Sequence, residues 1–227
     1  MNDQVISLQL VRVKCLDETG GRNAERTGND EISLSGFGID ATGEPVMLPP
    51  FRVYSHFDDG DVKEFSPPRT LLTLDVPSAG AFPKVGRAGL ILAEIDDSEA
   101  LTALAQKTFE KLTEQMEGTK QEMMGSGVNA TAIDWREVWD VVGPIVYGYV
   151  KDLIAAGLAD DVFPPKEVSV DIASDDFYWG DGTKLSPEAT VEFRGHEGLY
   201  YLTYYWEIQT LASSHVGGGG VWQGGSP

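Results

Sequence analysis

The segment from Tyr200 to Ile208 alternates apolar and polar side chains, and this alternation restricts the fold more than any other feature of the sequence. A period of two places successive side chains on opposite faces of an extended strand. Short strand-like runs separated by turn residues are typical of an all-β sandwich. The sequence therefore predicts a mainly β protein built as an antiparallel β-sandwich. The other strand-like runs are Val5 to Leu16, Glu31 to Ile39, Phe51 to Phe57, Leu71 to Val76, Ala88 to Ile95 and Val168 to Ile172.

The N-terminal run changes the phase of its alternation partway along. Apolar side chains occupy every second position from Ile6 to Leu10 and then the opposite set of positions from Val11 to Cys15. An extra residue in one strand of a pair shifts the phase in this way, and a strand buried on both faces also tolerates the change. We expect either a β-bulge or a doubly buried strand here.

Between the strand-like runs lies a region with helical spacing. Ser98 is a candidate N-cap for a helix that runs to about Glu117, and Asp134 with Glu137 forms the start of a second helix. Residues 119–133 are rich in Gly, Ser, Thr and Met and are expected to form a mobile connector. Pro144 is expected to kink the second helix or to break it in two.

These elements predict three parts of the chain. Residues 1–97 and 160–212 form the sandwich, residues 98–159 form a helical insertion, and residues 213–227 form a flexible Gly-rich tail.

Composition limits the classes of function. The chain has 227 residues and a formal net charge of -19, so it is an acidic protein that repels nucleic acid and anionic membranes unless a divalent cation reverses the local field. The single cysteine excludes an intrachain disulfide. The N-terminus has no basic and apolar signal-peptide pattern, and the run from Val141 to Val150 is too short for a bilayer. We expect a protein made in the cytoplasm, with leaderless export as an alternative.

Acidic groups recur where strand-like runs begin or end. In an antiparallel sandwich such ends can converge at one pole, and converging carboxylates are tolerated mainly when a cation neutralises them. Two carboxylates two positions apart on a strand, such as Glu94 and Asp96, point to the same side. The pattern predicts a calcium site, and the competing interpretation is a set of solvated loop carboxylates. The candidate metal ligands are Asp17, Asp30, Glu94, Asp96, Asp97, Asp160 and Asp161.

Three of these segments resemble C2 domains. The segment from Gly28 to Leu34 is similar to the C2 segment in which a loop aspartate, here Asp30, precedes the second strand. The segment from Glu94 to Asp97 resembles the Asp-x-Asp pair that ends a later strand, with Glu in first place. The segment from Asp160 to Phe163 resembles the closing aspartates, and Val168 to Ile172 is then the next strand. The resemblance implies a calcium-dependent module that binds a membrane or a partner, with the helical segment inserted in the third calcium loop.

The chain departs from the C2 pattern in two respects. C2 domains usually carry another aspartate six residues before the one that matches Asp30, and here that position is Ala24, so that Asp17, Glu18 or Asn23 would have to replace it. The large helical insertion is also unusual for the family.

A second acidic stretch contains three adjacent aromatic residues, Phe177, Tyr178 and Trp179. Its spacing does not match an EF-hand loop. The triplet is interpreted as an exposed contact loop, and the alternative is that it packs onto its own domain.

The preferred function is a non-catalytic, calcium-binding β-sandwich module that binds a protein partner or a calcium-dependent membrane surface. One alternative is a metal-free assembly or structural component, such as an injection-system, phage-like or toxin-accessory protein, and self-assembly into a homo-oligomer fits this class. A second alternative is a hydrolase that uses a carboxylate pair. The sequence contains no nucleophile elbow or phosphate-binding loop, and its three histidines lack metal-ligand spacing.

Overall fold

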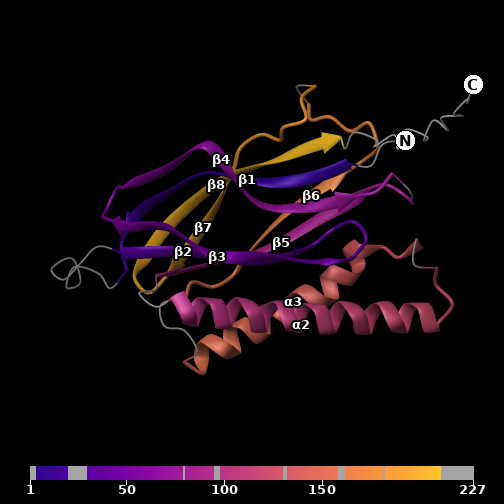
Figure 1. Cartoon of the computed structure of the whole chain (residues 1–227), viewed down its shortest axis with the longest axis horizontal. Coiled ribbons are helices and arrows are strands. Elements are labelled where there is room, and N and C mark those ends of the chain that lie inside the picture. The colour runs from indigo at the N-terminus through magenta and orange to yellow at the C-terminus, as the bar shows by residue number, and fades with distance from the viewer. Residues whose placement is uncertain are drawn as a thin grey trace, which may run out of the picture.

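The computed structural model describes residues 4–19, 30–78, 80–94, 98–129, 132–157, 162–180 and 182–210. Eight strands and two helices follow one another in these ranges, with both helices between the fifth and sixth strands (Figure 1). The strands are β1 (Gln4–Asp17), β2 (Asp30–Ile39), β3 (Pro45–Phe57), β4 (Val62–Val76), β5 (Lys84–Glu94), β6 (Lys166–Ile172), β7 (Ala189–Gly195) and β8 (Gly198–Thr210), and the helices are α2 (Ser98–Gly125) and α3 (Trp135–Ala155).

The strands form two four-stranded sheets in which all neighbours are antiparallel. Sheet A has the order β4-β1-β8-β7, and sheet B has the order β3-β2-β5-β6. The two sheets face each other, and α2 and α3 lie against the other side of sheet B (Figure 1). This arrangement confirms the prediction of a mainly β sandwich with a helical insertion.

A β-bulge in β1 explains the change of phase in the N-terminal run. The pairing of β1 with both β4 and β8 shifts between Leu10 and Arg12, so Val11 is the extra residue. After the bulge, Val13 and Cys15 point to the same core as the residues before it, and both side chains are fully buried. Of the two alternatives expected from the sequence, the bulge is therefore present.

The core between the sheets contains the alternating side chains that predicted the strands. Each large apolar side chain buried there contributes about 1.5–3 kcal/mol relative to exposure. Aromatic rings fill one end of this core, where Phe163 makes edge-to-face contacts with Phe193 and Tyr200, and Tyr200 makes a third with Phe57. The sandwich core also includes Ile6, Leu8, Leu10, Ile32, Leu34, Leu72, Leu74, Leu90, Leu92, Val168, Ile172, Leu202, Trp206 and Ile208.

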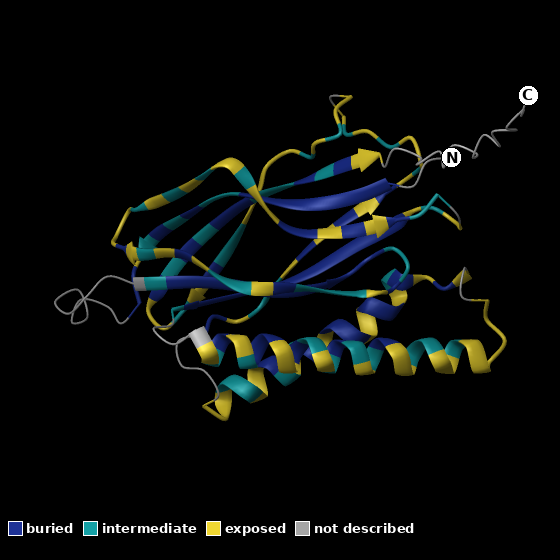
Figure 2. Cartoon of the chain, in the orientation of Figure 1, coloured by how far each residue is buried: buried dark blue, intermediate teal, exposed yellow. Residues whose placement is uncertain are grey.

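The central strands of sheet B, β2 and β5, are buried on both faces, whereas its edge strands β3 and β6 have exposed side chains (Figure 2). On β5, Leu90 and Leu92 point into the sandwich core, whereas Ile91 and Ala93 point toward the helices. A second apolar core therefore lies between sheet B and the helical layer. Its helical members are Leu101, Leu104, Leu112, Met116, Trp135, Val138, Trp139, Val142, Val146 and Val150.

The first helix is longer than the sequence predicted. Residues 119–125 are helical, so the connector expected over 119–133 is wrong in its first half. Gly118 does not end the helix, and Lys120 beyond it forms an ion pair with Glu44 at 3.0 Å. Tertiary contacts thus extend a helix through a glycine that weakens it only modestly.

The second helix begins where the sequence predicted. The side chain of Asp134 accepts a hydrogen bond from the backbone N–H of Arg136, which is the expected N-cap interaction. Pro144 lies inside a continuous helix, so the expected break at this residue is wrong. Burial of Val142 and Val146 against sheet B stabilises the segment on both sides of the proline. No helix in the described ranges is both long and apolar enough to span a bilayer.

Close contact between β2 and β5 depends on a glycine. The ring of Phe37 lies over Gly89, and a Cβ atom at Gly89 would be 2.5 Å from that ring. Phe37 is buried beneath Trp139 and Tyr147 of α3, so the ring has no free space into which to move.

We expect Gly89→Ala to lower the free energy of unfolding by about 1–3 kcal/mol, because the added methyl overpacks the second core. Gly118→Ala is the matched control, since a Cβ atom there meets no other atom within 4 Å, and this change should stabilise the helix by about 0.5–1 kcal/mol. Urea denaturation of both variants measures the difference. Equal stabilities would contradict the close contact at Gly89.

Candidate functional site

Three of the predicted metal ligands lie at one pole of the sandwich. Asp17 ends β1, Asp30 begins β2 and Glu94 ends β5. Ile32 pairs with Glu94, so the ends of β2 and β5 lie side by side. Asp17 is exposed and Glu94 is partly buried. We call this end of the molecule the acidic pole, and the convergence of strand ends expected from the sequence occurs there.

The other four predicted ligands, Asp96, Asp97, Asp160 and Asp161, lie outside the described residues. Within the described ranges, no group of three or more His, Cys, Asp or Glu side chains is arranged to hold a metal ion. The calcium site therefore stays a prediction.

The acidic pole also contains a short loop rich in aspartate. Asp58 to Asp61 connect β3 to β4, and the Asp59 carboxylate accepts a hydrogen bond at 3.0 Å from the backbone N–H of Glu18. The Asp61 carboxylate accepts one from the backbone N–H of Asp58 at 3.2 Å. These carboxylates stabilise the loop against the end of β1, which is a common role for aspartate in turns.

The aromatic triplet lies on the segment between β6 and β7. Phe177 and Trp179 contact the sandwich core and each other, with ring centroids 5.2 Å apart. Tyr178 is 54% exposed, and the Lys184 ammonium lies 3.8 Å from the centre of its ring. Only Tyr178 of the three is thus well placed to contact a partner, and the contact loop stays a prediction.

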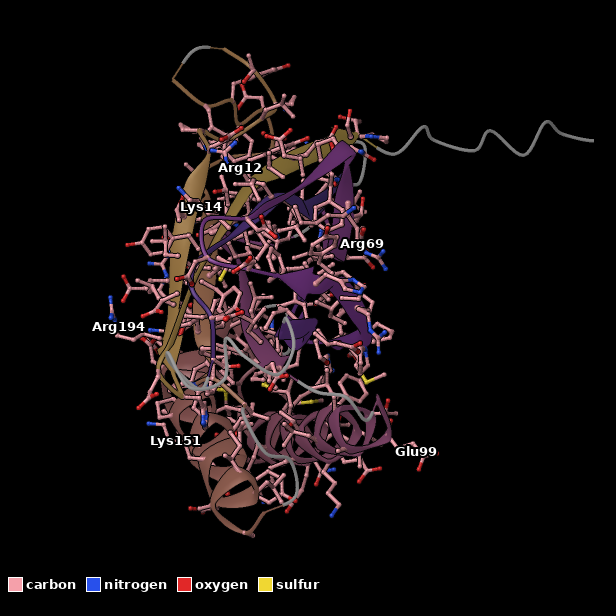
Figure 3. The ribbon with its side chains drawn as sticks, turned by 90° about the vertical axis from the view of Figure 1, so that its left-hand side faces the viewer. Arg12, Lys14, Arg69, Glu99, Lys151 and Arg194 are labelled. Carbon is pink, nitrogen blue, oxygen red and sulfur yellow. The ribbon has the colours of Figure 1, made fainter. Side chains whose placement is uncertain are left out.

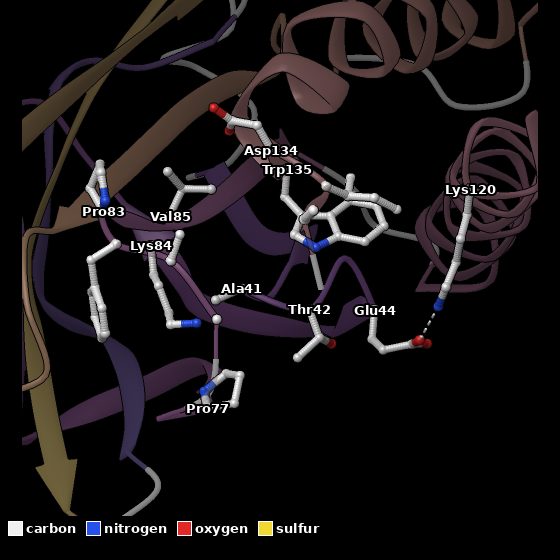
Figure 4. A pocket seen from close by; sticks show the side chains of 15 residues that line it. Ala41, Thr42, Glu44, Pro77, Pro83, Lys84, Val85, Lys120, Asp134 and Trp135 are labelled. Carbon is white, nitrogen blue, oxygen red and sulfur yellow. Dashed lines mark hydrogen bonds and ion pairs between the residues drawn. The ribbon is translucent and has the colours of Figure 1, made fainter. Parts of the chain in front are cut away.

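A pocket of about 600 Å³ lies at the pole opposite the acidic one, between the turns of sheet B and the helical layer (Figure 4). Four separate segments form its wall: the β2–β3 turn, the β4–β5 turn with the start of β5, the distal half of α2, and the start of α3. The side chains that dominate the wall are Phe82, Pro77, Pro83, Val85, Ile133 and Trp135, with Thr42, Glu44, Lys84, Lys120 and Asp134 as the polar members.

The β2–β3 turn is held in shape by a buried carboxylate. Asp40 accepts hydrogen bonds from the backbone N–H groups of Thr42 and Glu44 at 2.7 and 3.0 Å, and from the Thr42 hydroxyl at 2.7 Å. Burial raises the pKa of Asp40, and these hydrogen bonds oppose the rise. All three hydrogen bonds go to Oδ1 of Asp40, and they fix the turn that carries Thr42 and Glu44 to the pocket.

Trp135 forms the inner wall of the pocket on the side of α3. It is the first residue of the helix, and its ring lies against Gly43 in the β2–β3 turn. Gly43 has a φ of 80°, a left-handed conformation that favours glycine, and a Cβ atom there would collide with the indole ring. Gly43 therefore allows the turn and the helix to meet closely beside the pocket.

Two lysines supply positive charge to a wall that is otherwise mainly apolar. The Lys84 ammonium lies 5.1 Å from the centre of the Phe82 ring, and burial lowers the pKa of this lysine. Lys120 forms its ion pair with Glu44 at the edge of the pocket (Figure 4). None of the described side chains of the wall is a Ser, Cys or His.

Sequence reasoning did not find this pocket. Its polar members are ordinary surface residue types, and they come from segments far apart in the chain. No motif or periodicity signals their proximity.

No protein-family model matches the chain, and no curated protein matches it. Its function must therefore be argued from the chemistry of its sites.

The contact of Gly43 with Trp135 can be tested with two glycines that share a left-handed conformation. Gly43→Ala should destabilise the protein by about 1–3 kcal/mol more than Gly60→Ala, because only the first change also forces a methyl into the indole ring. Gly60 has a φ of 87° and open space around it, so it isolates the backbone effect. Thermal unfolding of both variants gives the comparison, and equal losses would mean that Trp135 does not pack on this turn.

Proposed function

We propose that this chain is a non-catalytic binding module that takes a small amphipathic ligand in the pocket beside Trp135. The proposal rests on the volume of the pocket together with the side chains that line it. A volume of about 600 Å³ falls within the range of roughly 300–1,000 Å³ that is usual for small-molecule sites, and apolar walls with a few polar groups are typical of such sites.

The lining indicates the chemistry of the ligand. Trp135, Phe82 and the neighbouring prolines offer flat apolar surface to an aromatic or alicyclic group. Lys84 places a positive charge in the wall, so a ligand with an acidic end is favoured over one with a basic end. Thr42 adds a hydroxyl that can donate or accept a hydrogen bond. The expected ligand is therefore a compact aromatic or alicyclic acid.

The anionic fluorophore ANS is a suitable first probe because it combines aromatic rings with a sulfonate. We expect saturable binding to the folded protein, weakened at least about tenfold by Ala81→Trp, which fills the pocket with a new indole. Ala189→Trp on β7 is the matched control, since Ala189 is exposed and distant from the pocket wall, and it should leave the affinity unchanged. Equal ANS affinities for the two variants would contradict the proposal.

A second candidate function is calcium-dependent binding of a protein partner or a membrane surface at the acidic pole. The specific observation in its favour is that strand ends carrying Asp17, Asp30 and Glu94 lie at one pole. Calcium is bound through several carboxylate and carbonyl oxygens from flexible loops. Asp96, Asp97, Asp160 and Asp161 are the remaining ligands in this proposal.

If calcium binds there, it should raise the melting temperature, because a ligand at 100 times its dissociation constant adds about 2.7 kcal/mol to stability. Asp96→Asn should remove most of the increase, and Glu117→Gln on the exposed side of α2 should not. Melting curves in chelator and in calcium test this. An unchanged melting temperature would rule out the proposed calcium site. It would favour the metal-free assembly component, with a carboxylate-pair hydrolase as the remaining alternative.

A further inference from the structure

Lys84 is the one buried lysine among the described residues, and its exposed fraction is 8%. It opens β5, in which Ala88, Leu90 and Leu92 at alternate positions point into the sandwich core. Lys84 lies in the same phase of the strand, and it pairs with the fully buried Ile172 of β6. Lysine is rarely buried to this extent. The register of β5 therefore places an amine where a core side chain is expected.

The buried amine of Lys84 borders the ligand pocket. Lys84 lines the cavity of about 600 Å³ together with Pro77 and Phe82, and its Nζ lies 5.1 Å from the centre of the Phe82 ring. Figure 4 shows the Lys84 side chain extending from β5 toward Ala41 and Pro77. A small molecule in this cavity would therefore lie beside the amine in mainly apolar surroundings.

Burial changes the reactivity of this lysine. Removal from water disfavours the ammonium and lowers the pKa of Lys84, so that at a given pH more of Lys84 than of a surface lysine is the neutral amine. The neutral amine has a lone pair that can attack a carbonyl carbon, whereas the ammonium has none. Desolvated lysines in hydrophobic pockets are the usual lysines that form Schiff bases with carbonyl compounds.

We propose that Lys84 holds a carbonyl-bearing ligand in the pocket as a reversible imine, an inference that rests on the proposed function of the same pocket. The ligand is then an aromatic or alicyclic acid that also carries an aldehyde or a ketone. The amine lone pair attacks the carbonyl carbon to form a C–N bond, and a proton moves from nitrogen to oxygen. The nitrogen lone pair then expels the hydroxyl group, which leaves as water with a proton from solvent. The protonated imine that remains can return that proton to solvent.

The walls of the pocket favour the imine over the free carbonyl compound. Contact of the ligand ring with Trp135 and Phe82 would hold the carbonyl group near the amine and raise its effective concentration. The acidic end of the ligand can pair with Lys120 at the edge of the pocket. The ion pair of Lys120 with Glu44 is partly exposed to solvent, and such pairs contribute little stability, so Lys120 can exchange this partner at low cost.

Two aromatic acids of nearly equal size separate imine formation from simple binding. The aldehyde 4-formylbenzoate can form the imine, whereas the alcohol 4-(hydroxymethyl)benzoate cannot. We expect the aldehyde to displace ANS from the full chain at a concentration at least about fivefold lower than the alcohol requires. Lys84→Arg keeps the positive charge and should abolish this difference, and Lys84→Met, which has a similar unbranched side chain, should do the same. Lys120→Arg is the matched control and should preserve it.

Reductive trapping tests the natural chain without any substitution. Cyanoborohydride converts an imine into a stable secondary amine, and mass spectrometry of peptides locates it. Lys151 is a suitable reference, since it is exposed and Figure 3 shows it at the edge of the helical layer. With limiting 4-formylbenzoate, Lys84 should carry at least about fivefold more label than Lys151, because its pKa is lower and the pocket holds the reagent. Excess alcohol should protect Lys84 and leave the labelling of Lys151 unchanged.

The outcomes separate the imine from the pocket itself. Displacement of ANS by both compounds at equal concentrations, with no preference for Lys84 in the trapping experiment, would overturn the imine and leave a non-covalent ligand site. Failure of both compounds to displace ANS, with equal labelling of Lys84 and Lys151, would overturn the imine and the proposed function together. Labelling of Lys84 that the alcohol does not reduce would overturn the assignment of the reaction to the pocket.

Discussion

The burial of the two central strands of sheet B, β2 and β5, on both faces is the constraint on which the rest of the structure depends. Its outer face presents Phe37, Ile91 and Ala93, and these side chains would contact water if the helices were absent. Because α2 and α3 cover them, the insertion is a structural layer of the sandwich and is held by the same apolar surface that forms the sheet. The positions of both helices, and of every residue that they carry, follow from this contact.

The pocket exists because the helical layer of α2 and α3 packs on sheet B. The turns of sheet B and the start of α3 meet where Gly43 leaves room for Trp135, and the cavity lies beside that contact. Asp40 fixes the turn on one side, and the Asp134 N-cap fixes the helix on the other. A pocket between two elements that are each fixed by hydrogen bonds is largely preformed, so the protein would lose little conformational entropy if a ligand bound there.

The molecule thus has chemically distinct ends and faces. The acidic pole gathers loop carboxylates, and the opposite pole holds an apolar pocket with Lys84 and Lys120 in its wall. The α3 helix uses one face to complete the second core and exposes an apolar stripe on the other.

Local pattern alone determined the sandwich, the helical insertion and the N-cap at Asp134, because each depends on periodicity or on interactions between neighbours in the sequence. The phase change in the N-terminal run indicated a bulge as one of two alternatives, and the pairing of β1 places it at Val11. It missed β7, of which only Phe193 is buried, and it ended α2 too early at Gly118, because contacts with distant residues decide both. The sequence also indicated that strand ends could meet at one pole, and the ends at Asp17, Asp30 and Glu94 do lie at one pole. The pocket was not, since only the tertiary structure brings the β2–β3 turn beside Trp135, and no property of either segment encodes that distance.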